Sequence, residues 1–178
     1  AAQTSSHYSN ENPMKDAKLN LIPIINFVET FRGIQKKPSI ILSGTVTEAG
    51  VTKVFPVSES FMDQPVTIYD INKLAAEKFL QYYANQIGRK AVILRLANLY
   101  GPGPSCSRLD RGILNVMVKK AIALEPLTVY GKGNLIRDYV YIDDVVMAFL
   151  LAGIHMEKLS GKYYVIGSGK GNTIKNMV

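Results

Sequence analysis

Tyr69 and Lys73 are the residues with the clearest potential for chemistry, because they stand four positions apart at the start of a predicted helix. On a helix this spacing places both side chains one turn apart on neighbouring faces. A free phenol has a pKa of about 10, and a nearby ammonium group favours the phenolate, as would a cationic cofactor. Tyr69 is therefore a candidate general acid or base. The alternative is a surface tyrosine beside a solvated lysine, since this pair is common by chance.

The residues around the pair predict where this helix begins and ends. Thr67 can cap its N-terminus through the hydroxyl group, and Asp70 completes a capping box three residues later. Gly88 is a typical C-terminal stop. The apolar residues recur at spacings of three and four, which predicts a buried stripe formed by Ile68, Ile71, Ala75, Phe79 and Tyr82.

The remainder of the chain alternates helical patterns with short apolar runs. We predict four further helices, over residues 14–32, 110–124 and 143–156 and from residue 173 onward. Pro23 should form a kink or an irregular turn in the first, and Asp143 or Asp144 should cap the third. In the second, the residues expected to face inward are Ile113, Met117, Ala121 and Leu124. Predicted strands cover 39–42, 90–96, 127–130, 137–142 and 162–166. Such alternation favours an α/β fold with a parallel sheet, which binds ligands at the carboxyl ends of its strands. Thr45 and Asn98 follow two of these strands.

Composition and charge narrow the class of protein. The chain has 178 residues, 47% hydrophobic and 20% charged, with a net charge of +7, as expected for a soluble globular domain. The Lys and Arg residues are scattered along the chain. This favours a solvated surface, or binding of phosphorylated small molecules, over binding of nucleic acid. The single cysteine, Cys106, fits a reducing compartment, no signal peptide is visible, and the longest apolar run (145–154) is too short to cross a bilayer. We find no metal-ligand cluster.

Four separated stretches occur in an order and at spacings that resemble one protein family. The stretches are Ser43-Gly44-Thr45, Tyr69-x-x-x-Lys73, Arg95-Leu96-Ala97-Asn98-Leu99-Tyr100-Gly101-Pro102-Gly103, and Arg137-Asp138-Tyr139-Val140-Tyr141-Ile142-Asp143-Asp144. Two weaker matches are Ala1-Ala2-Gln3 and Val165-Ile166-Gly167-Ser168-Gly169. Together they resemble the extended short-chain dehydrogenases/reductases, in particular the nucleotide-sugar epimerase/dehydratase group typified by UDP-glucose 4-epimerase.

The resemblance implies an α/β fold class: an NAD(P)-binding Rossmann-like parallel sheet that is partial, with its N-terminal half missing, and part of a smaller substrate-binding domain. Residues 1–103 would form the C-terminal half of the Rossmann-like domain. Residues 104–178 would contribute to the substrate-binding domain and the last sheet strands. Members hold the cofactor pyrophosphate on a Gly-rich turn that is absent from these 178 residues. We therefore expect an internal fragment that is inactive and binds NAD poorly by itself.

The same resemblance implies a catalytic set of Thr45, Tyr69 and Lys73. Thr45 would hydrogen-bond the reacting sugar oxygen and relay a proton, with capping at the strand end as the alternative. Tyr69 would take the sugar hydroxyl proton. Lys73 would lower the pKa of Tyr69 and, with Tyr69, bind the nicotinamide ribose of NAD. Ala1 and Ala2 would lie along the cofactor.

Substrate contacts are implied for four residues. Thr45 would contact the sugar, and Asn98 the substrate diphosphate, with turn formation as the alternative for Asn98. Arg137 would clamp the nucleotide phosphate through its planar guanidinium, unless it pairs with Asp138 or Asp143. Tyr130 would lie near the nucleotide base, although core packing is as plausible.

Val46 and Thr47 bear on the type of reaction. They stand where the 4,6-dehydratases of this family carry an Asp-Glu pair, and a neutral pair cannot supply that general acid and base. This favours an NAD-dependent 4-epimerase that acts on a nucleotide-diphosphate sugar through a transient 4-keto sugar, in surface-polysaccharide or sugar-nucleotide biosynthesis. A nucleotide-sugar reductase or decarboxylase, or a catalytically silent nucleotide-binding member, is the alternative. We expect a cytoplasmic homodimer at full length, with no nucleic-acid or membrane partner.

Overall fold

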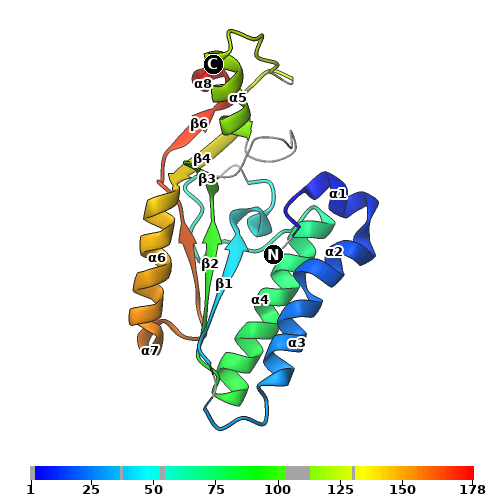
Figure 1. Ribbon diagram of the computed structural model, residues 1–178, viewed down its shortest axis with the longest axis vertical. Helices are drawn as coiled ribbons and strands as arrows, with labels where there is room; N and C mark the ends of the chain where they lie inside the picture. Colours follow the sequence, from blue (N-terminus) through cyan, green and yellow to red (C-terminus); the bar gives the residue numbers. More distant parts are fainter. Residues whose placement is uncertain (1–2, 37, 53–54, 103–112, 130) are drawn as a thin grey trace.

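A three-stranded parallel sheet organises the structure, a computed structural model that describes residues 3–36, 38–52, 55–102, 113–129 and 131–178. The strands lie in the order β1 (Ile40–Thr45), β2 (Ala91–Leu96) and β5 (Tyr163–Ile166). Helices α3 (Ile22–Thr30) and α4 (Ile68–Ile87) cover one face, and α6 (Ile142–Ile154) and α7 (Met156–Leu159) cover the other (Figure 1). The predicted α/β class with a parallel sheet is confirmed.

The central strand β2 divides the core into two layers, because its successive side chains point to opposite faces. Ile93 packs with Val28 of α3 and Leu80 of α4. Val92 and Leu94 pack instead with residues of α6 and α7. A strand buried on both faces reads as the continuous apolar run seen in the sequence.

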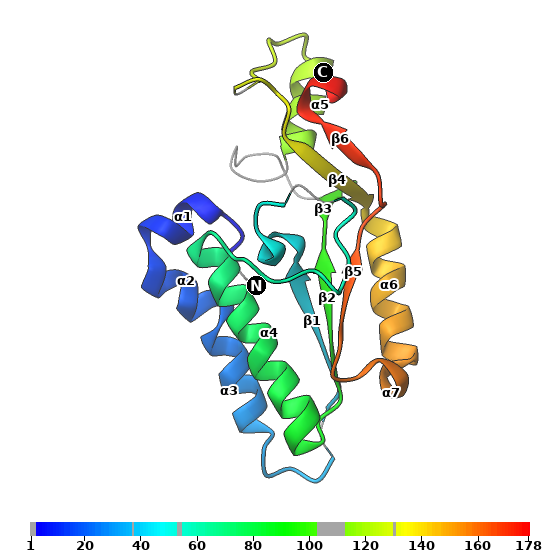
Figure 2. The ribbon, with the colours of Figure 1, turned by 180° about the vertical axis from the view of Figure 1, so that it is seen from behind.

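A second sheet lies beyond the carboxyl ends of the first. It is formed by β3 (Asn98–Tyr100), β4 (Ile136–Tyr141) and β6 (Gly171–Thr173), with β3 parallel and β6 antiparallel to β4. Helices α5 (Ile113–Ile122) and α8 (Ile174–Met177) stand at the far end of the molecule (Figure 2). The strand predicted at 127–130 is not formed over residues 127–129, and no residue of α5 is buried, so its predicted inward face was wrong.

The N-terminal region forms three short helices in place of one long one. These are α1 (Ser6–Glu11), α2 (Pro13–Asn20) and α3, and the predicted helix over 14–32 is interrupted at Leu21. Pro23 lies in the first turn of α3, where its missing N–H costs no helical hydrogen bond. The interruption lets α2 and α3 both pack along α4. In α6 the N-cap is Tyr141, so neither Asp143 nor Asp144 caps that helix as predicted.

The ends of α4 agree with the sequence, but its buried face does not. Thr67 and Asp70 form the capping box, and Gly88 closes the helix at a φ of 67°. Three residues of the predicted stripe are instead 41% to 57% exposed: Ile71, Phe79 and Tyr82. The buried face carries several polar residues: Asp70, Asn72, Lys73 and Glu77, beside Ala76, Leu80 and Tyr83. This face can be buried because its polar side chains form hydrogen bonds and ion pairs with residues of the sheet and of α2.

Candidate active site

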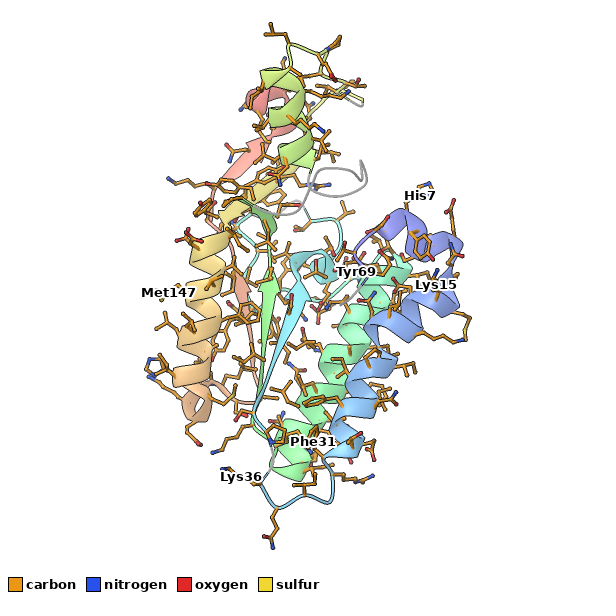
Figure 3. The ribbon with its side chains drawn as sticks, viewed as in Figure 1. His7, Lys15, Phe31, Lys36, Tyr69 and Met147 are labelled. Carbon is orange, nitrogen blue, oxygen red and sulfur yellow. The ribbon has the colours of Figure 1, made fainter. Side chains whose placement is uncertain are left out.

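Thr45, Tyr69 and Lys73 meet at the carboxyl end of β1. Thr45 is the last residue of β1, and the other two belong to the first two turns of α4. The Lys73 ammonium donates a hydrogen bond to the carbonyl of Ser43, and the Tyr69 hydroxyl is a hydrogen-bond partner of Thr45. Figure 3 shows Tyr69 at the N-terminal end of α4, beside the end of β1. The three candidate groups therefore share one site.

Helix α1 holds the N-terminus of α4 in place. The first backbone N–H groups of a helix have no partner within the helix. The N–H of Ile68 donates to Asn10 Oδ1 at 3.0 Å, and the N–H of Tyr69 donates to Ser9 Oγ at 3.0 Å. Ser9 is fully buried. These contacts fix the backbone of Tyr69, and they come from α1, about sixty residues earlier in the chain.

The surroundings of Tyr69 disfavour the phenolate. Burial raises the pKa of Tyr69 to about 12. The negative charge of Asp70, Glu48 and Asp16 adds to this shift. In the chain as described, burial and these three acidic residues outweigh the lowering expected from Lys73, whose ammonium donates to the Ser43 carbonyl.

Lys73 lies in an unusually enclosed position for a lysine, at 6% exposure. Burial lowers the pKa of its ammonium group, because a low-dielectric environment disfavours the charge. Three carboxylates oppose the shift and favour the charged form: Glu48, Asp16 and Glu77. The Lys73 amine is thus buried among acidic side chains from three separate elements.

Arg95 of β2 is the centre of a buried ion-pair network directly beneath the site. Its guanidinium donates to both oxygens of Glu77 at 2.8 Å each, and to both oxygens of Asp63 at 2.6 and 3.1 Å. It also lies 3.0 Å from Glu48 and stacks 3.7 Å over the ring of Tyr163. These contacts raise the pKa of Arg95 despite its burial. The network ties α4, β5 and the segment after β1 to the central strand.

Burial opposes the ionisation of Asp63, but the hydrogen bonds and charge of Arg95 outweigh it and lower the pKa of that carboxyl. Asp63 belongs to the long polar segment that follows β1. The same segment reaches β5, where the Glu59 carboxylate accepts the N–H of Val165 at 2.8 Å. This polar segment is thus fastened across the sheet by Arg95 and by β5.

Glu48 is a residue of this site that the sequence reasoning missed. It lies in a short 3-10 helix (Val46–Ala49), where its carboxylate accepts the backbone N–H of Thr45 at 3.1 Å. The Thr45-x-x-Glu48 spacing is a capping box, so the signal was present in the sequence. Burial, reinforced by the charge and hydrogen bonding of Glu77, raises the pKa of Glu48 to about 8. Glu48 is therefore much easier to protonate than an exposed glutamate.

We predict that Glu48→Gln removes a pH dependence of stability. The folded state holds a proton on Glu48 up to about pH 8, whereas the unfolded chain releases it near the ordinary pKa of 4.5. The wild-type chain therefore loses stability as pH rises through this window, by about 1.4 kcal/mol per pH unit. Urea unfolding should give similar stabilities at pH 4 and a more stable Gln variant at pH 8. The exposed substitution Glu11→Gln is the control, and a difference that stays constant across the window would contradict the assignment.

Asn98 and Arg137 lie on the second sheet, apart from the Tyr69 cluster. The Asn98 side chain donates to the carbonyl of Asp138 at 3.2 Å and so joins β3 to β4. Arg137 is exposed, and its guanidinium contacts the carbonyl of Ile136 at 3.3 Å. The Asp138 carboxylate accepts instead from the backbone of the 168–169 turn. Within the described residues, Arg137 forms no ion pair with either carboxylate considered as its alternative partner.

Three predicted site residues lie outside the described part of the chain: Ala1, Ala2 and Tyr130. Over the described ranges, no cluster of three or more His, Cys, Asp or Glu side chains could hold a metal ion. Among those same residues, no helix is long and apolar enough to span a membrane.

A parallel sheet with a Thr, Tyr and Lys cluster at its carboxyl edge places the chain among Rossmann-like α/β proteins. Residues 1–167 match the NAD dependent epimerase/dehydratase family. The chain belongs to that family.

Individual relatives agree with this assignment. The chain is 28% identical to a putative UDP-glucose 4-epimerase of Methanocaldococcus jannaschii, over 99% of this chain and 56% of the relative. It superposes on UDP-glucose 4-epimerase of Thermotoga maritima, solved with UDP-glucose, with a TM-score of 0.91 and 35% identity, over 99% of this chain and 56% of the other. For UDP-glucose 4-epimerase of Thermus thermophilus, solved in complex with NAD, the TM-score is 0.85 and the identity 28%, over 99% of this chain and 57% of the other. The chain thus spans about half the length of these relatives.

Proposed function

We propose that the protein is an NAD-dependent nucleotide-sugar 4-epimerase that acts through a transient 4-keto sugar. The observation that carries the proposal is the meeting of Thr45, Tyr69 and Lys73 at the carboxyl edge of the sheet. The relatives named UDP-glucose 4-epimerase support it. The neutral pair Val46 and Thr47 supports epimerisation over dehydration, because neither side chain is a general acid or base at neutral pH.

The donor groups of the site fit NAD. The buried Lys73 ammonium has three N–H donors, of which the described hydrogen bonds use one, to Ser43. Together with the Tyr69 hydroxyl it can bind the two hydroxyls of the nicotinamide ribose. Ala1 and Ala2 are proposed to lie along the same cofactor. When bound, NAD would supply reversible hydride chemistry at C4 of the sugar, and its positive charge would favour the Tyr69 phenolate.

Tyr69 is proposed as the base that takes the proton from the C4 hydroxyl and as the acid that returns it. Its pKa of about 12 in the protein alone means that the phenol is protonated at neutral pH. The site must therefore supply positive charge before Tyr69 can act as a base. Lys73, one turn from Tyr69 on α4, is the protein cation proposed to contribute to this positive charge. Thr45 is proposed to orient the reacting sugar oxygen.

The substrate contacts remain proposals for Thr45, Asn98, Arg137 and Tyr130. The exposed guanidinium of Arg137 is free of carboxylates among the described residues and suits bidentate binding of a phosphate. Asn98 could contact the diphosphate only by sharing its amide with the Asp138 carbonyl. The nucleotide-diphosphate sugars named for the relatives make UDP-glucose the first substrate to test.

The wider setting is also a proposal. We propose that residues 1–103 belong to the cofactor-binding domain and that residues 104–178 contribute to the substrate-binding domain and, through β5, to the same sheet. A homodimer is supported by exposed apolar side chains on α4, namely Ile71, Phe79 and Tyr82. We further propose that the protein acts in the cytoplasm, in the biosynthesis of sugar nucleotides or surface polysaccharides. The 178 residues by themselves are proposed to be inactive.

The test uses a protein that contains this chain at the full length of its relatives. Proton NMR should show UDP-glucose converting to its C4 epimer with NAD present and no net consumption of reduced cofactor. Stoichiometric oxidation of NADH or NADPH would identify a reductase instead, and release of carbon dioxide from a UDP-uronate a decarboxylase. Tight binding of UDP-sugars without conversion of any would identify a silent nucleotide-binding member.

A further inference from the structure

Thr47 connects the Thr45 hydroxyl to a buried carboxylate. Its Oγ1 lies 3.0 Å from Thr45 Oγ1 and 2.5 Å from Asp70 Oδ1. Asp70 is 1% exposed, and its other oxygen accepts the N–H and the hydroxyl of Thr67 at 3.1 and 2.7 Å. A continuous series of hydrogen bonds therefore runs from the candidate active site to the N-cap of α4.

The chemistry of the groups fixes the direction of this series. An ionised carboxylate only accepts hydrogen bonds, so the single hydroxyl proton of Thr47 is committed to Asp70. Thr47 Oγ1 then offers only a lone pair to Thr45, which must donate its own proton to Thr47. Thr45 Oγ1 also accepts the N–H of Thr47 at 3.3 Å. Thr45 Oγ1 can therefore offer Tyr69 a lone pair as a hydrogen-bond acceptor, but it has no proton to donate to Tyr69.

We propose that Thr47, backed by Asp70, is a positioning residue that holds the Thr45 hydroxyl as a hydrogen-bond acceptor toward Tyr69. Its relevance to turnover rests on the proposed function, whereas the orientation itself does not. In this arrangement the Tyr69 phenol donates to Thr45, which favours the protonated acid. Thr45 cannot pass a proton to Tyr69, so a sugar proton must reach Tyr69 directly.

The first test is a titration of Tyr69 in the 178-residue chain, with 13C at tyrosine Cζ and the signal assigned from Tyr69→Phe. In Thr47→Val, a variant of nearly the same shape, Thr45 loses its acceptor and can turn to donate to the phenolate. The pKa of Tyr69 should fall by about one unit, the equivalent of one hydrogen bond. The variant removes none of the charged groups around Tyr69: Asp70, Glu48, Asp16 and Lys73.

Two matched variants distinguish positioning from general damage. Thr47→Ser keeps the hydroxyl and should restore the wild-type titration. Thr30→Val removes a threonine hydroxyl that donates to the carbonyl of Asn26 at an exposed position of α3, and should leave the titration unchanged. An unaltered Tyr69 titration in Thr47→Val, or a failure of the serine to restore it, would overturn the proposal.

A second measurement needs no variant. Neutron diffraction of the deuterated wild-type chain should place the deuteron of Thr45 Oγ1 on the line to Thr47 Oγ1, and that of Thr47 on the line to Asp70. A Thr45 deuteron directed at Tyr69 would refute the proposed orientation. Neither measurement involves a nucleotide sugar, so failure of the proposed function would leave both results intact.

Discussion

Tyr69→Phe is expected to reduce turnover by about 10²-fold or more, the scale of lost general acid–base catalysis. The substitution removes only the phenol oxygen, which is the sole proton-transfer group proposed at C4. Binding of the nucleotide-diphosphate sugar should change little, because its proposed phosphate contacts, Asn98 and Arg137, lie on the second sheet. The measurements are kcat and calorimetric affinity, in a protein that contains this chain at the full length of its relatives.

Tyr82→Phe is the matched control for this variant. Tyr82 lies on the same helix but is exposed, and its ring packs edge-on against Tyr83. It should keep wild-type turnover. Near-normal kcat in Tyr69→Phe at saturating substrate would remove Tyr69 from the proposed mechanism, whatever its position in the site.

Arg95→Met is expected to destabilise the chain by about 3–5 kcal/mol, because removing one partner leaves buried charges uncompensated. Glu77 would lose its two charged donors and Asp63 its bidentate partner, while Glu48 would lose the nearest cation. Such a loss is a large fraction of the stability of a typical domain. Urea unfolding followed by circular dichroism measures it directly.

Two further variants separate charge from bulk in that experiment. Arg32→Met removes an exposed arginine that pairs with Glu29 at 3.2 Å, and should cost less than about 1 kcal/mol. Arg95→Lys keeps the charge but not the bidentate geometry, and should lie between the two. A loss for Arg95→Met no larger than that for Arg32→Met would show that the buried network does not stabilise the fold.

The ends of α4 could be predicted from sequence because they depend on local chemistry. Thr67, Asp70 and Gly88 satisfy or terminate backbone groups within five residues of themselves, so their roles do not require knowledge of the tertiary structure. The break before α3 was likewise signalled by Pro23. Tyr69 and Lys73 could be placed together for the same reason.

The buried face of α4 could not be predicted from apolar periodicity. Glu77 and Asp70 are buried because Arg95 and Thr47 supply hydrogen-bond donors to them from distant positions in the chain. A pattern of apolar spacing contains no information about these partners, so the predicted buried stripe lies on the wrong side of the helix. The raised pKa of Tyr69 has the same origin, because part of it depends on carboxylates brought close by the fold.

The measurement that tests the central proposal most directly follows the hydrogen at C4. A nucleotide-diphosphate sugar labelled with deuterium at C4 is incubated with NAD and a protein containing this chain at the full length of its relatives. If one site removes and returns the same hydride, the C4 epimer forms with the deuterium retained at C4, and Tyr69→Phe abolishes nearly all conversion. An epimer that has lost its deuterium to solvent, or no epimer from any nucleotide sugar that binds, would contradict the account.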